Sequence, residues 1–144
     1  MLIGIPPILS PELMKVLMEM GHGDEIVLAD GNFPASSMGR RLVRADGHPI
    51  LPLLDAILRF FPLDRFVQKP LLCMSVVPGD KTKPVIWEEF RRIVSSRVES
   101  APELAFLERF EFYERARGAY AIVATGERAL YANIILKKGV VAAD

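Results

Sequence analysis

The sequence predicts a three-layer α/β/α domain in which helices cover both faces of a mostly parallel β-sheet. Several short apolar segments show no polar–apolar alternation, which is typical of strands buried on both faces. Segments with apolar residues at helical spacing lie between them, as in α/β proteins. The chain has 144 residues, 51% of them hydrophobic. That is enough for one core, so we expect a single domain over residues 1–144.

The first helix is predicted over Pro11–Met20. Ser10 supplies a side-chain oxygen that can cap free backbone N–H groups, and proline is favoured at the first helical position. Apolar residues then recur every three or four positions, and Gly21 is a natural C-terminal cap. The segment Glu25–Asp30 follows, and its continuous apolar run predicts the first buried strand.

The middle of the chain continues this alternation. Prolines 49, 52 and 62 bracket a second predicted helix, whose apolar positions are Leu51, Leu54, Ile57, Leu58 and Phe61. Leu71–Val77 has the composition of a second buried strand. A third helical face runs from Trp87 to Val94 and includes Phe90 and Ile93.

The last third leaves one element open. The aromatic residues of Phe110–Arg117 fit either an alternating strand or one side of a helix. Ala119–Thr125 has the composition of a buried strand, and Asn133–Leu136 is expected to be the closing strand.

Composition excludes several classes of protein. Eighteen Lys and Arg balance eighteen Asp and Glu, so the basic excess that nucleic-acid binding needs is absent and nucleic acid is a poor candidate partner. No apolar run approaches the length that spans a membrane. The single cysteine, Cys73, cannot form an intramolecular disulfide, and a reducing cytoplasm is expected. A mean hydropathy of +0.25 with zero net charge favours an oligomer that covers apolar surface.

Motifs for metal and phosphate binding are missing. The sequence contains no HExxH motif, no paired Cys and His ligands and no phosphate-binding GxxxxGK[ST] loop, so we expect no metal site. Cys73 lies in an apolar segment and is expected to be a buried core residue. His48, next to Gly47 and Pro49, is expected in a turn.

A few polar residues stand where a ligand site would form. His22 lies between two glycines in a loop, although a structural or exposed histidine is the commoner interpretation of such a residue. Asp30 ends the first predicted strand, where open α/β sheets bind ligands, or it caps the next turn. Tyr131 and Asn133 are two residues apart and would point to one side of a strand. Arg109 and Tyr113 fit either a site or a charged surface helix.

These residues occur in blocks that resemble one family, the sugar mutarotases that comprise L-fucose mutarotase and D-ribose pyranase. The resemblance covers nearly the whole chain, with residues 62–104 matching only in pattern. The two most specific blocks are Met20-Gly21-His22-Gly23-Asp24-Glu25-Ile26 and Tyr131-Ala132-Asn133-Ile134-Ile135-Leu136. Arg109 and the segment Phe112-Tyr113-Glu114-Arg115-Ala116 are closer to the fucose branch, because the ribose branch usually has histidine at position 109.

The resemblance implies a three-layer α/β fold, no metal, no organic cofactor, and a ring-shaped homo-oligomer, commonly a decamer, with sites close to subunit interfaces. It assigns catalysis to His22 and substrate binding to the family's carboxylate, arginine and Y-x-N positions. In this sequence those positions are Asp30, Arg109, Tyr131 and Asn133.

The expected function is interconversion of the α and β anomers of a free monosaccharide, most simply L-fucose. Opening a cyclic hemiacetal needs one acid and one base, and histidine can serve as either near neutral pH. His22 would take one part and Tyr131 the other, as proton donor or acceptor. Asp30 would fix the tautomer of His22 or bind a sugar hydroxyl, and the ring of Phe33 or Tyr113 would cover the apolar face of the sugar. A D-ribose pyranase and a non-catalytic sugar-binding protein are the alternatives.

Overall fold

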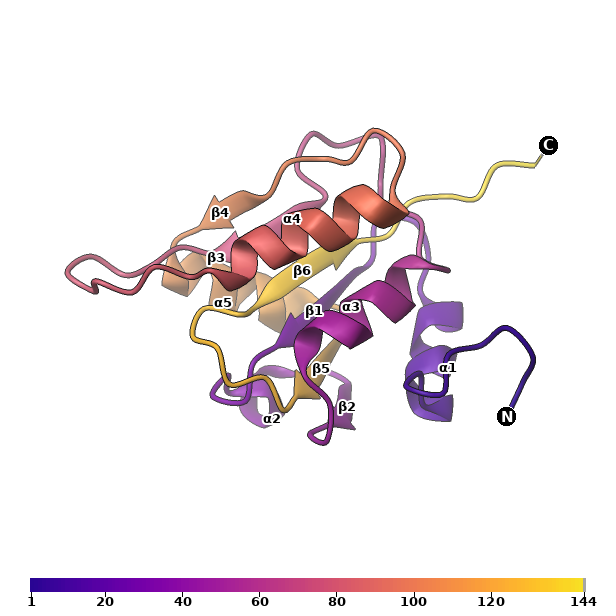
Figure 1. The fold of residues 1–144 in the computed structure, drawn as a ribbon, viewed down its shortest axis with the longest axis horizontal. Helices are drawn as coiled ribbons and strands as arrows, with labels where there is room; N and C mark the ends of the chain where they lie inside the picture. Colours follow the sequence, from indigo (N-terminus) through magenta and orange to yellow (C-terminus); the bar gives the residue numbers. More distant parts are fainter. Residues whose placement is uncertain (144) are drawn as a thin grey trace.

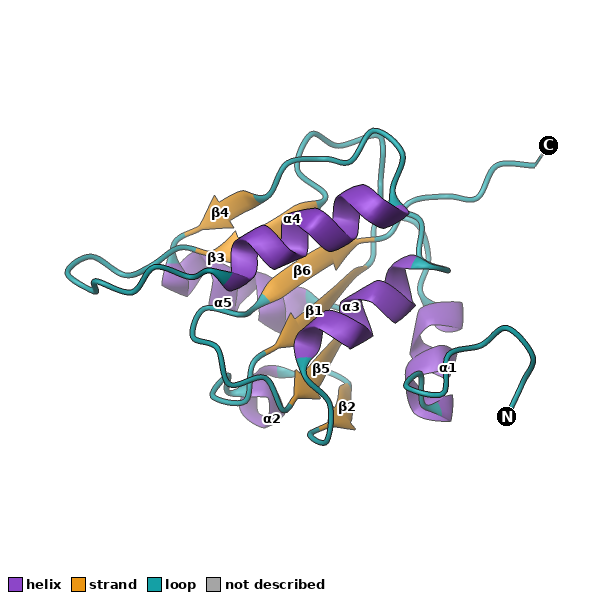
Figure 2. Ribbon diagram, viewed as in Figure 1, coloured by secondary structure: helices purple, strands orange, loops and turns teal. Residues whose placement is uncertain are grey.

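The structure, a computed structural model, describes residues 1–143 as a six-stranded sheet between two layers of helices (Figure 1). Helices α1, α3 and α4 pack on one face, and α2 and α5 pack on the other. Figure 2 shows α3 and α4 in front of the sheet and α5 behind it. The predicted α/β architecture is therefore confirmed. The elements are α1 (Pro11–Glu19), β1 (Glu25–Ala29), α2 (Ala35–Met38), β2 (Leu42–Ala45), α3 (Ile50–Leu58), β3 (Leu71–Met74), α4 (Ile86–Arg97), β4 (Ala105–Leu107), α5 (Arg109–Gly118), β5 (Ala121–Thr125) and β6 (Ile134–Lys137).

The strand order in the sheet is β2-β5-β1-β6-β3-β4. β1 and β2 are both parallel to β5, and β3 is parallel to β4, whereas β6 is antiparallel to its neighbours β1 and β3. The sheet is thus mostly parallel, as predicted. The expected closing strand is the last along the chain, but it lies in the interior of the sheet.

Burial on both faces explains the unbroken apolar strands. In β1, Ile26 and Leu28 face the layer of α1, α3 and α4, whereas Val27 and Ala29 face the layer of α5, and all four side chains are inaccessible to solvent. Alternation of polar and apolar residues would place a polar group in one of the two cores, where it would cost free energy.

The segment that the sequence left open is the helix α5. The Glu108 side chain accepts the N–H groups of Phe110 and Glu111, which fixes the start of the helix. Phe112 and Ala116, four residues apart, face the sheet and are fully buried.

Three short elements, α2, β2 and β4, were not predicted. Each has three or four residues, too few to establish a periodicity. The predicted strand Leu71–Val77 ends earlier, at Met74.

Within residues 1–143, no helix is long and apolar enough to cross a membrane.

Candidate active site

Five of the six predicted site residues lie at one edge of the sheet. The parallel strands β1 to β5 end at this edge, which we call the carboxyl edge, and β6 starts there because it runs in the opposite direction. Asp30 directly follows β1, and Asn133 directly precedes β6. Since β1 and β6 are neighbours, the topology brings these two side chains together.

Asp30 and Asn133 form a reciprocal hydrogen-bonded pair. The Asp30 backbone N–H donates to Asn133 Oδ1 at 2.9 Å, and Asn133 Nδ2 donates to Asp30 Oδ2 at 2.9 Å. The backbone N–H of Asn32 donates to Asp30 Oδ1 at 3.0 Å. Burial raises the pKa of Asp30 above its usual range, although these donors oppose that effect. Asn133 therefore orients Asp30, and the remaining lone pairs of the carboxylate can accept hydroxyl groups.

Tyr131 has an unusual backbone conformation at the same edge. Its φ of +59° lies in the left-handed region, which costs a residue other than glycine about 1–2 kcal/mol. The indole N–H of Trp87 donates to the Tyr131 carbonyl at 3.1 Å, and the Tyr131 hydroxyl bonds Asp80 Oδ2 at 2.5 Å. Burial and this carboxylate raise the pKa of Tyr131, the hydrogen bond to Asp80 having the larger effect. Neighbouring elements therefore fix both the backbone and the phenol.

An arginine and several aromatic rings complete the carboxyl edge. Arg109, the first residue of α5, donates through Nε to the Tyr113 hydroxyl at 3.2 Å and lies over the Phe110 and Tyr113 rings. Phe33, from the segment after β1, meets Tyr113 edge to face with centroids 5.6 Å apart. Arginine donors beside aromatic faces are the groups that hold hydroxyls and the apolar face of a sugar.

His22, the sixth predicted site residue, lies elsewhere. It precedes β1, whereas Asp30 follows it, so the two residues stand at opposite edges of the sheet. At about 3.3 Å per residue, the strand separates them by roughly 20 Å. One chain therefore does not bring His22 to Asp30, Tyr131 or Asn133. We call the edge that carries His22 the amino edge.

At the amino edge His22 has a carboxylate partner that the sequence analysis missed. His22 Nε2 lies 3.2 Å from Asp64 Oδ1, and the Phe66 ring packs against the imidazole with centroids 5.5 Å apart. Asp64 is buried, with a side chain 3% exposed, whereas the His22 side chain is 45% exposed. The Phe66 N–H, with a smaller effect from His22, holds the pKa of Asp64 below its usual range, so this carboxyl group is ionised at neutral pH.

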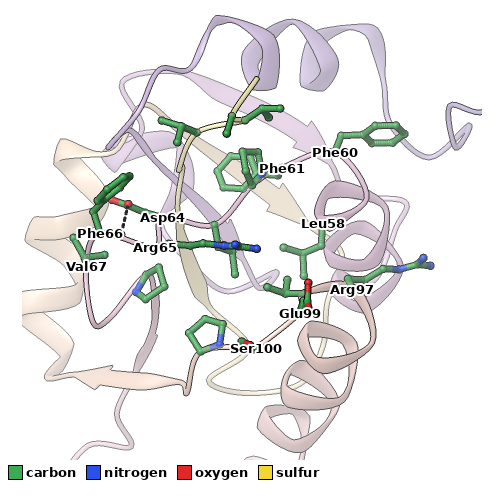
Figure 3. Close-up of a pocket in the computed structure, with 18 of the residues that line it drawn as sticks. Leu58, Phe60, Phe61, Asp64, Arg65, Phe66, Val67, Arg97, Glu99 and Ser100 are labelled. Carbon is green, nitrogen blue, oxygen red and sulfur yellow. Dashed lines mark hydrogen bonds between the residues drawn. The ribbon is translucent and has the colours of Figure 1, made fainter. Parts of the chain in front are cut away.

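A cavity of about 1010 Å³ adjoins Asp64 and Phe66 (Figure 3). It is open to solvent, and residues 140–142 near the C-terminus line part of its wall. Apolar side chains around it are exposed, with Phe66 at 77% and Val141 at 83%. Such exposed apolar surface is typical of a protein–protein contact.

Metal binding and thiol chemistry are the two remaining possibilities that the sequence analysis considered. Among residues 1–143, no group of three or more His, Cys, Asp or Glu side chains is arranged to hold a metal ion. Cys73 is fully buried in β3, and burial raises the pKa of its thiol to about 12, so it is not a nucleophile at neutral pH.

Comparison with known proteins gives concordant matches over nearly the whole chain. Residues 3–141 match the family described as RbsD / FucU transport protein family. An L-fucose mutarotase from Haemophilus influenzae (strain PittGG) is 54% identical over 140 residues, covering 97% of both chains. A human fucose mutarotase is 53% identical, covering 96% of this chain and 94% of the human protein. The crystal structure of the fucose mutarotase from Streptococcus pneumoniae in complex with L-fucose superposes with a TM-score of 0.93 at 52% identity, covering 98% of this chain and all of that chain.

Proposed function

The chain belongs to the RbsD / FucU family, and from this membership we propose that it is a mutarotase that interconverts the α and β anomers of L-fucose. The observation that carries the proposal is identity above 50% over nearly full length to fucose mutarotases, one of them solved with L-fucose bound. The polar and aromatic groups at the carboxyl edge are of the kind that holds a monosaccharide.

The proposed reaction is ring opening and reclosure by general acid/base catalysis. A base takes the proton of the anomeric hydroxyl while an acid protonates the ring oxygen, and the carbonyl group rotates before the ring closes again. This chemistry needs no redox partner and no nucleophile, so we propose no cofactor. Correctly placed acid and base groups contribute roughly 10²–10⁴-fold each.

We assign His22 as one member of this acid/base pair and Asp64 as its positioning residue. An ionised carboxylate only accepts hydrogen bonds. Asp64 therefore accepts a hydrogen bond from the Nε2–H of His22, which leaves Nδ1 as the nitrogen that meets the sugar. This is the tautomer-fixing role that the sequence left open for Asp30. Asp30 is instead assigned to a sugar hydroxyl, together with Arg109 and Asn133.

The separation of His22 from the carboxyl edge leads us to propose a site shared by two subunits. The amino edge of one subunit would meet the carboxyl edge of the next and bring His22 to Tyr131 and Asp30. A contact between two different surfaces repeats around a ring. Exposed apolar residues at both edges support this contact, with Phe66 and Val141 at one and Phe110 and Val85 at the other. We propose a ring-shaped homo-oligomer, a decamer, in which residues 1–144 form one domain per subunit.

We also propose that the enzyme works in the cytoplasm on the free sugar. The single thiol, Cys73, is buried and unpaired, which suits a reducing compartment.

The test is magnetisation-exchange NMR between the anomers of L-fucose, with D-ribose in parallel. The protein is expected to accelerate fucose exchange, and His22→Ala is expected to fold and assemble but to lose most of that acceleration, roughly 10²-fold or more. The matched control is His48→Ala, which removes the chain's other histidine and should leave exchange unchanged. Acceleration confined to ribose would make the protein a pyranase, and tight sugar binding without acceleration would make it a binding protein.

A further inference from the structure

The Tyr131 hydroxyl has two protein partners, and both come from the loop that joins β3 to α4, the long loop at the left of Figure 1. The phenol donates a hydrogen bond to Asp80 Oδ2 at 2.5 Å and accepts a long hydrogen bond, 3.4 Å, from the Val77 N–H. A phenol has a single proton to donate. The donor capacity of Tyr131 is therefore used, and only a lone pair on its oxygen remains for a ligand.

Hydrogen bonds orient Asp80 so that one of its oxygens accepts from Tyr131. Its Oδ1 accepts both the N–H and the hydroxyl of Thr82, at 2.8 and 2.6 Å. Its Oδ2 faces the phenol. These hydrogen bonds, that of Thr82 first and that of Tyr131 second, lower the pKa of Asp80, so its carboxyl group is ionised at neutral pH and accepts rather than donates.

The rest of Tyr131 is fixed independently of Asp80. Its left-handed backbone is tied to Trp87 through the indole N–H, and the Trp87 ring packs on Phe106 with centroids 4.6 Å apart. Loss of the Asp80 carboxylate would therefore change the direction of the phenol proton more than the place of the ring.

We propose that Asp80 is a positioning residue for anomer exchange: it accepts the hydrogen bond that the Tyr131 phenol donates, so that Tyr131 meets a sugar hydroxyl as a hydrogen-bond acceptor. The proposal rests on the proposed function, in which Tyr131 contacts the sugar. It also decides between the two roles that the sequence leaves open for Tyr131. The hydroxyl group of the sugar donates, and Tyr131 is not the acid of the reaction.

The test measures L-fucose exchange at saturating sugar in a graded series. Asp80→Ala removes the acceptor of the phenol hydrogen bond. The exchange rate is expected to fall roughly tenfold, the effect of losing a hydrogen bond to a charged group. Asp80→Asn keeps an amide oxygen that can accept the phenol proton, and its rate is expected to lie between those of Asp80→Ala and the wild type. The control is Thr82→Val, which loosens the same turn but leaves the partner of Tyr131 in place, and it should keep nearly full activity.

A double-mutant cycle separates positioning from loop structure. In a Tyr131→Phe background there is no phenol proton to direct, so adding Asp80→Ala should cause no further loss. If Asp80→Ala lowers the rate equally in both backgrounds, Asp80 acts through something other than Tyr131 and the proposal is overturned. A wild-type rate in Asp80→Ala also overturns it.

A spectroscopic measurement tests the hydrogen bond without turnover. The chain has three tyrosines, so labelling the ring carbon that bears the hydroxyl gives few NMR signals, and Tyr131→Phe assigns one of them. Asp80→Ala should move the Tyr131 signal and lower the pKa of this phenol, with Arg109 and the Val77 N–H still nearby, whereas Thr82→Val should not. An unmoved signal contradicts the proposal. A wild-type protein that accelerates no sugar would instead refute the proposed function.

Discussion

Asp30 is a carboxylate on which burial and hydrogen bonding act in opposite directions. Burial has the larger effect, so the pKa of Asp30 is raised above its usual value of 3.8 despite the donors Asn32 and Asn133. The folded chain then binds this proton more tightly than the unfolded chain. Asp30 therefore contributes stability that is fully present below the unfolded pKa and is lost as pH rises through the folded pKa.

Asp30→Asn should remove this dependence on pH. As pH rises above 3.8 and through the folded pKa of Asp30, the wild-type protein should lose stability relative to the variant, because asparagine has no such proton to release. Denaturant unfolding at a fixed protein concentration measures the difference. Asp46→Asn is the control: Arg44 lowers the pKa of the exposed Asp46, so its difference from wild type should stay constant in this range. A constant difference for Asp30→Asn would show that its pKa is not raised.

Arg109→His tests whether position 109 selects the sugar. The guanidinium lies over the Phe110 and Tyr113 rings and bonds the Tyr113 hydroxyl, and imidazole lacks its fork of donors. Losing a charged donor to a sugar hydroxyl should lower fucose exchange roughly tenfold. Measured beside D-ribose, the fucose-to-ribose ratio should fall. An unchanged ratio would exclude Arg109 as a specificity residue.

Individual residues were predictable from the sequence where an element determines their place. Asp30 and Asn133 stand at ends of buried strands, so the strand pattern alone indicates a position at a sheet edge. Asp64 and Asp80 could not be found in this way. Both lie in loops without periodicity, and their partners His22 and Tyr131 are 42 and 51 residues away in the sequence.

Helix α5 contacts the candidate site through the buried ring of Phe112. Phe112 is fully buried against the sheet and meets Phe33 edge to face at 5.9 Å, while Phe33 also contacts Tyr113. Phe112 thus links the core between the sheet and helices α2 and α5 to the aromatic side of the candidate site.

Phe112→Ala should lower the free energy of unfolding by about 3–5 kcal/mol, because it leaves a cavity in the core. Glu111→Ala, one residue earlier on the same helix, removes an exposed polar side chain and should cost far less. Denaturant unfolding of the two variants at equal protein concentration makes the comparison. Equal losses would mean that α5 does not pack on the sheet through Phe112.

At the scale of elements, the sequence predicted those whose burial leaves a clear pattern. The largely apolar strands β1, β3 and β5 were found, and so were helices α1, α3 and α4, whose apolar residues recur at helical spacing. The short edge strands β2 and β4 have too few residues for a pattern, and α5 has few apolar residues, which left helix and strand equally acceptable. The interior place of β6 depends on long-range pairing that sequence order does not reveal.

The whole molecule carries its two sets of candidate groups at opposite edges of one sheet. His22 and Asp64 stand at the amino edge, and Asp30, Tyr131 and Arg109 stand at the carboxyl edge. No rearrangement of side chains closes roughly 20 Å of β-strand. A site that contains both sets therefore needs two subunits, so catalysis requires the assembled oligomer.

Subunit complementation tests whether two subunits share each site. His22→Ala and Tyr131→Phe subunits are purified separately, each with greatly reduced L-fucose exchange, then dissociated, mixed in equal amounts and reassembled. If each site takes His22 from one subunit and Tyr131 from the next, about a quarter of the sites in random mixed rings hold both wild-type residues. Magnetisation-exchange NMR should then show about that share of wild-type exchange. Exchange no higher than the average of the two parent variants would contradict a shared site.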